Sequence, residues 1–185
     1  MSRAWPATGS RRWIVAVFLA AHVSGCTAAR VIPVGSFQSI ESPPKTIALA
    51  PSGAVFADLI GVALAEQGYT IIDSGATLAL LMLMQQSADD LLSPQVLSML
   101  KERGVDAVLL VPRVAAEDGL PESVHVRLYS TDEMAEVGGI DWQNSWRRRG
   151  VWEAAQEIAT AMAQSSRPAA GPVGEGDRES LRSQN

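Results

Sequence analysis

The stretch Glu102–Val114, ERGVDAVLLVPRV, holds the strongest strand signal in the chain and sets the class of the fold. Its run from Val105 to Val111 is aliphatic and rich in β-branched residues, which favours a buried strand. Gly104 is placed to end the helix before this strand. Pro112 cannot donate an amide hydrogen to a ladder, so we expect an edge or a bulge at that residue.

Helices and short strands alternate before this stretch. Apolar runs closed by turn residues predict strands, whereas apolar residues at helical spacing, a capping Ser93-Pro94 and a terminal Gly68 predict helices. The expected elements are a strand at Thr46–Ala50, a helix at Ala54–Gln67, a strand at Tyr69–Asp73, and helices at Ala76–Gln86 and from Pro94 to Arg103.

Two paired strands and a helix are expected after it. Val124, Val126 and Leu128 alternate with polar residues, which is the pattern of a strand with one buried face. Gly119 to Pro121 forms the turn before that strand, and Gly138-Gly139 predicts a bulge in its partner strand, on which Ile140 and Trp142 share a face. The last helix, Val151 to Gln164, has one apolar stripe, and we expect the following side chains to be core: Trp152, Ala155, Ile158, Ala159 and Met162. The fold class is therefore α/β (α+β), a single mixed-sheet domain of order β-α-β-α-α-β-β-β-α.

The N-terminus has the three parts of a secretory signal. Three arginines and no acidic residue precede the apolar run Trp13–Val23, which is too short to cross a bilayer. The run ends in Val23-Ser24-Gly25-Cys26, which resembles the bacterial lipobox. On that resemblance the signal peptidase recognises Val23, Ser24 and Gly25, and Cys26 becomes the lipidated first residue. Arg11-Arg12 leaves export by the general or by the twin-arginine route open.

Four regions follow from these patterns. Residues 1–25 are a lipoprotein signal peptide, and residues 26–45 are the lipidated cysteine and a flexible tether whose nineteen residues after Cys26 could reach about 60 Å. Residues 46–165 form the α/β domain, and residues 166–185 a disordered tail. Whether residues 31–37 add an edge strand stays open.

Composition excludes several classes of function. The chain has a formal charge of −5, and without residues 1–25 it has 12 basic against 20 acidic residues, a charge of about −8. Such a surface is a poor match for nucleic acid, so membrane affinity must come from the lipid anchor. We expect no metal, no cofactor and no enzymatic activity, because His125 has no second histidine beyond the signal and the pairs Asp89-Asp90 and Glu117-Asp118 lie in loops.

One cluster predicts a contact surface. Trp146, Arg147, Arg148 and Arg149 combine an aromatic side chain with the only run of three like charges in the chain. Tryptophan favours membrane interfaces and guanidinium binds phosphate or carboxylate groups, so the cluster could touch lipid headgroups or an acidic partner. The alternative interpretation is a solvated turn before the last helix.

Four sequence patterns resemble one protein family. These are TIALAPSG, LAEQGYTIIDSG, ERGVDAVLLVPRV and VRLYSTDEMAEV, and they are similar to the CsgG, LpoB and PelC group of bacterial lipoproteins, which share a TolB N-terminal-like domain. In that family a Gly-Ala-Asp precedes the long hairpin, and Gly104-Val105-Asp106 stands there in this chain. The resemblance implies a domain that binds or regulates an envelope protein partner. Thr27 follows Cys26 in place of the aspartate that resembles an inner-membrane retention signal, so we expect the outer membrane, with the domain facing the periplasm. The alternative is a homo-oligomeric subunit of a polysaccharide or protein secretion assembly.

Overall fold

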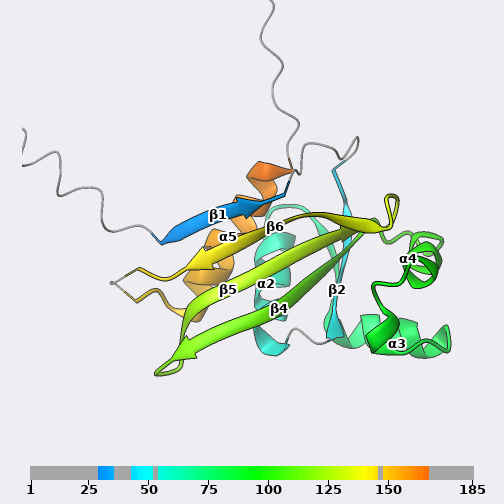
Figure 1. The fold of residues 1–185 in the computed structure, drawn as a ribbon, viewed down its shortest axis with the longest axis horizontal. Helices are drawn as coiled ribbons and strands as arrows, with labels where there is room; N and C mark the ends of the chain where they lie inside the picture. Colours follow the sequence, from blue (N-terminus) through cyan, green and yellow to red (C-terminus); the bar gives the residue numbers. More distant parts are fainter. Residues whose placement is uncertain (1–28, 36–42, 52–53, 146–147, 167–185) are drawn as a thin grey trace, which may run out of the picture.

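A computed structural model describes residues 29–35, 43–51, 54–145 and 148–166. Six strands form one mixed sheet in the order β1-β6-β5-β4-β2-β3 (Figure 1). Strands β2, β3 and β4 are parallel, and β4, β5, β6 and β1 pair antiparallel. The strands are β1 (Arg30–Val34), β2 (Thr46–Leu49), β3 (Thr70–Ile72), β4 (Ala107–Glu117), β5 (Leu120–Ser130) and β6 (Ala135–Gln143).

Capping side chains define where the helices begin. Asp73 accepts a hydrogen bond from the backbone of Ala76 at 2.7 Å, and Ser93 accepts one from Val96 with Pro94 at the first helical position. These contacts satisfy amide groups that have no partner within the helix. The helices are α2 (Ala54–Glu66), α3 (Ser74–Leu83), the 3₁₀ helix η3 (Ala88–Asp90), α4 (Pro94–Lys101) and α5 (Val151–Ser165).

The predicted element order is confirmed, with one strand added before it. Residues 30–34, part of the segment expected to be a flexible tether, form β1 and pair with residues Gly139 to Gln143 of β6. Pro33 is accommodated because β1 is an edge strand, where one side of the backbone needs no ladder partner. The strand left open for residues 31–37 therefore exists, and residues 30–34 of the expected tether belong to the sheet.

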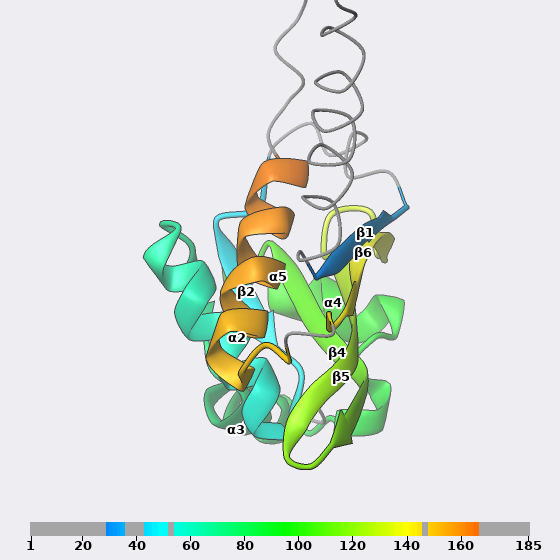
Figure 2. The same ribbon diagram turned by 90° about the vertical axis from the view of Figure 1, so that its left-hand side faces the viewer.

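Two hydrophobic clusters lie on opposite faces of the sheet. Helices α2 and α5 cover one face, against apolar side chains of β2, β4, β5 and β6. Helices α3 and α4 pack on the other face, mainly against β2 and β4, with Ile72 of β3 and Tyr129 of β5 at the margin of this cluster. Figure 2 shows α2 and α5 together on one side of the strands and α4 on the other. The face of β5 and β6 that points away from α5 carries half-buried polar side chains instead of a helix.

The β4–β5 hairpin has a two-residue turn at its tip and a bulge at Pro112. Glu117 pairs with Leu120, and the two turn residues Asp118 and Gly119 have φ angles of 52° and 77°, as a two-residue turn of this type requires. The β4–β5 register shifts between Leu110 and Arg113, which confirms the bulge expected at Pro112. The β5–β6 register also shifts between Leu128 and Tyr129, next to Gly138 in β6.

The two large aromatic side chains near α5 have different environments. Trp142 is fully buried, and its Nε1 donates a hydrogen bond to Glu157 Oε2 at 2.8 Å. Trp152, expected to be core, is 37% exposed because it lies at the first turn of α5, beside the solvated N-terminus of the helix. The remaining predicted residues of the α5 stripe are buried, as expected. None of the helices within the described residues is long and apolar enough to cross a membrane.

Candidate functional site

The predicted cationic cluster is only partly described. Arg148 donates hydrogen bonds to Glu117 Oε2 at 2.8 Å and to Asp118 Oδ2 at 3.1 Å, which raises the pKa of its guanidinium. Arg149 Nε lies 3.3 Å from Glu157 Oε1, an ion pair whose geometry does not make a hydrogen bond. Both described arginines thus have acidic partners within the domain. Whether they contact a lipid or another protein stays a prediction.

The other predicted site residues lie outside the described residues. These are the lipidation residue Cys26, the signal peptidase residues Val23, Ser24 and Gly25, and the contact residues Trp146 and Arg147. Their roles remain predictions from sequence. What the structure does place is β1, whose first residue, Arg30, follows Cys26 by four positions.

The open face of β5 and β6 carries a ladder of polar side chains. Asp141 Oδ1 accepts hydrogen bonds from Arg127 Nη1 at 2.8 Å and contacts His125 Nδ1 at 2.9 Å. Burial alone would raise the pKa of Asp141, but the contacts with Arg127 and His125 outweigh burial and lower the pKa. Tyr129 donates to Glu136 Oε2 at 3.3 Å, and its pKa is raised, first by burial and then by the Glu136 charge. The ladder is a set of cross-strand pairs that satisfy one another.

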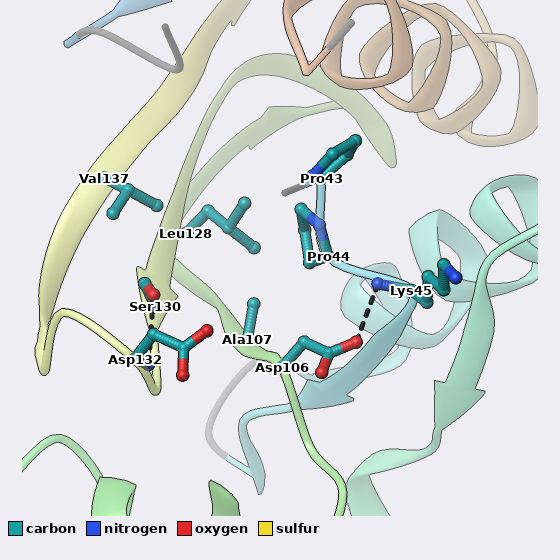
Figure 3. Close-up of a pocket in the computed structure, with 9 residues that line it drawn as sticks. All are labelled: Pro43, Pro44, Lys45, Asp106, Ala107, Leu128, Ser130, Asp132 and Val137. Carbon is teal, nitrogen blue, oxygen red and sulfur yellow. Dashed lines mark hydrogen bonds between the residues drawn. The ribbon is translucent and has the colours of Figure 1, made fainter. Parts of the chain in front are cut away.

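A small cavity opens at the end of the sheet where β2 and β4 begin. It has a volume of about 270 Å³, and Asp106 and Asp132 contribute carboxylates to its wall (Figure 3). Asp106 Oδ2 accepts hydrogen bonds from the backbone amides of Lys45 and Thr46, each at 2.8 Å, and Asp132 forms an ion pair with Lys101. Because its contacts fix the start of β2 beside the start of β4, Asp106 in the Gly104-Val105-Asp106 motif has a structural role.

Helix α3 exposes an apolar face to solvent. Thr77 and Leu81 are buried against the sheet, whereas Leu78 is 42% exposed, Met82 70% and Leu83 78%. No charged residue lies within this helix. A helix that is apolar on all sides is normally covered on all sides, so this outward face has the character of an interface.

Sequence patterns predicted the helix but not its exposed face. The unbroken apolar run from Leu78 to Met84 indicates complete burial, yet only one side of α3 meets the sheet. Because α3 is apolar on every side, contact with one sheet cannot bury all of its apolar side chains, and this was the signal in the sequence. The contacts of Asp141 join side chains of β5 and β6, so they depend on the register between these two strands, which the sequence does not specify.

The described residues contain no group of three or more His, Cys, Asp or Glu side chains that could hold a metal ion.

Comparisons with known proteins found similarity only among solved structures. No protein-family model matches the chain, and no curated protein matches it. A leucine-to-methionine variant of the PelC dodecamer from Paraburkholderia phytofirmans is 13% identical, with 75% of this chain and 98% of that chain covered and a TM-score of 0.46. A structure of the PelC dodecamer from the same organism, named without that substitution and in another crystal form, is 14% identical, with coverage of 76% and 99% and a TM-score of 0.45. Lipoprotein GNA1162 from Neisseria meningitidis is 16% identical, with coverage of 65% and 96% and a TM-score of 0.42.

Proposed function

We propose that this protein is a lipid-anchored envelope protein whose domain binds another envelope protein through the exposed face of α3. The observation that carries the proposal is the solvent exposure of Leu78, Met82 and Leu83 on one helix. Covering these side chains would stabilise a complex by roughly 1 to 2 kcal/mol each, since part of each side chain is already buried. A binding role, without catalysis, is part of the proposal.

The charges around α3 favour one kind of partner. Residues 46–100 include five acidic residues and no Lys, Arg or His. Asp73 lies at the start of α3, and Asp89 and Asp90 lie in the exposed η3 after it. A partner that presents apolar side chains with basic residues around them would match this surface. A second copy meeting it face to face would bring two acidic rims together.

Lipidation of Cys26 places this binding surface in the envelope. The thiol would carry the lipid, and Thr27 after the cysteine differs from the aspartate that resembles an inner-membrane retention signal, so we propose the outer membrane, with the domain facing the periplasm. Cys26→Ala should leave an unprocessed or soluble protein, as measured by metabolic lipid labelling and membrane fractionation. Lipid labelling that survives this change would refute the anchor.

The alternative function is a subunit of a homo-oligomeric secretion assembly. Figure 1 shows the acidic α3 region at the end of the domain opposite the beginning of β1, whose first residue, Arg30, forms no ion pair with the described residues. Opposite charge at two ends favours head-to-tail contact, the type of contact that closes into rings. Light scattering on the delipidated protein separates the two proposals, because only this alternative gives a defined oligomer without a partner.

Partner capture with matched variants tests the first proposal. The full-length protein is cross-linked in envelopes, solubilised in detergent and recovered, with Met82→Ser/Leu83→Ser as the test and Val55→Ser as the control. Val55 lies on α2 and is 75% exposed, close to the 78% of Leu83, so the control also replaces an exposed aliphatic side chain by serine. We expect the α3 variant to recover at least tenfold less of one discrete partner, the control to recover it fully, and added salt to weaken recovery. Equal recovery by both variants would refute α3 as the binding surface.

A further inference from the structure

The position of β1 limits how far the domain can move from a lipidated Cys26. Arg30, the first residue of β1, follows Cys26 after only three residues. Four fully extended residue steps span at most about 14 Å. Because all five residues of β1 pair with β6, no further length is available without breaking the sheet. The lipid would therefore hold the folded domain close to the bilayer.

The same pairing identifies which end of the domain is held there. Gln143 of β6 pairs with Arg30 on one side and with Ser123 of β5 on the other. The β4–β5 hairpin continues beyond Ser123 by three residues, or about 10 Å, to its turn at Asp118-Gly119. Figure 2 looks onto this end, where β1, the turn of the β4–β5 hairpin and the start of α5 all face the viewer. We name it the hairpin end; it comprises residues 29–30, 113–123 and 148–150.

The charge of the hairpin end suits an anionic surface better than the rest of the domain does. Arg30 and Arg113 are exposed and form no ion pair with the described residues. Arg148 forms ion pairs with both Glu117 and Asp118 and offsets one of these two negative charges, so the hairpin end as a whole has four arginines against three acidic residues. Elsewhere acidic residues dominate, and residues 46–100 have no basic residue at all.

We propose that the hairpin end lies against the phospholipid headgroups of the bilayer in which the protein is anchored, with Arg30 and Arg113 facing headgroup phosphates. This inference rests on the proposed lipidation of Cys26. The short linker fixes the orientation, and the arginines make it electrostatically favourable, because guanidinium binds phosphate through paired hydrogen bonds. Helices α3 and α4 then point away from the membrane.

Fluorescence quenching from the lipid surface tests the orientation. Lipidation occupies the only native cysteine, so a single introduced cysteine can be labelled specifically. The lipidated full chain carries a fluorophore at Glu122→Cys in the hairpin end or at Gln95→Cys in α4, both exposed positions. It is reconstituted in vesicles of phosphatidylethanolamine and phosphatidylglycerol that contain a nitroxide-headgroup lipid. We expect quenching at position 122 to exceed that at position 95 at least threefold.

A lengthened linker tests the cause of the orientation. An insertion of about fifteen Gly and Ser residues between Thr27 and Ala28 should release the domain and reduce quenching at position 122 to the level at position 95. Equal quenching at the two positions in the native-length protein, or unchanged preferential quenching after the insertion, would overturn the proposal. Mass spectrometry of the same samples identifies lipidated Cys26. An unlipidated protein refutes the proposed anchor together with this inference, whereas a lipidated protein without preferential quenching refutes this inference alone.

Discussion

Replacing each of the two tryptophans near α5 by alanine should give very different losses of stability. Trp142 is fully buried between β1, β5 and α5, and the largest core residues cost about 3 to 5 kcal/mol when truncated to alanine. Trp142→Ala also removes the 2.8 Å hydrogen bond to Glu157, so we expect about 4 to 5 kcal/mol. Trp152 is 37% exposed at the first turn of α5, and Trp152→Ala leaves a site open to water rather than a closed cavity. We expect it to cost only about 1 to 2 kcal/mol.

Urea unfolding followed by far-ultraviolet circular dichroism measures both losses without relying on tryptophan emission. With a slope near 2 kcal/mol per molar, the unfolding midpoint should fall by roughly 2 M for Trp142→Ala and by less than 1 M for Trp152→Ala. Trp142→Phe serves as a control, since it keeps most of the packing and loses the hydrogen bond to Glu157. Equal losses for the two alanine variants would refute the different burial on which the reasoning depends.

Three further predictions concern the sheet. The pKa of Asp141 is lowered in the folded protein, so Asp141 stabilises the fold at pH values above its unfolded pKa of about 4. This stabilisation is lost as the pH falls through the folded pKa. The difference in unfolding free energy between wild type and Asp141→Asn should therefore shrink on acidification, as urea titrations at several pH values would show. A chain that begins at residue 36 should be about 1 to 3 kcal/mol less stable than one that begins at residue 29, and the β6 amides should exchange faster by NMR, because β6 becomes an edge. Gly139→Ala should destabilise by about 1 to 3 kcal/mol in thermal melts, because the added Cβ would lie 2.2 Å from the backbone oxygen of Val126; an unchanged melting temperature would contradict this.

Local sequence rules predicted the elements whose causes are themselves local. The hairpin turn expected at Gly119 to Pro121 is present one residue earlier, at Asp118-Gly119, where both residues adopt positive φ angles. Pro112 produces its bulge because it lacks an amide donor, and Ser93-Pro94 begins α4 through a side-chain cap. In each case one residue and its neighbours determine the backbone, so the rest of the fold need not be known.

The features that sequence patterns missed depend on contacts between distant segments. Pro33 and the Gly and Ser residues after it favour a linker, yet Val31 lies opposite Trp142 and packs against the main core. Trp152 belongs to the apolar stripe of α5 by spacing, but its place at the helix start leaves it partly solvated. The exposure of one face of α3 depends on how α3 packs against the sheet, which the sequence of the helix does not specify.

The orientation proposed for the hairpin end determines where a partner must meet α3. Eleven-residue strands such as β4 and β5 span roughly 36 Å. Helices α3 and α4 flank the part of the sheet far from the hairpin turn (Figure 1). If the turn touches the headgroups, the exposed Met82 and Leu83 lie on the order of 30 Å from the membrane surface. A partner therefore needs a periplasmic domain that projects at least this far, since the three-residue linker after Cys26 does not let the α3 surface approach the bilayer.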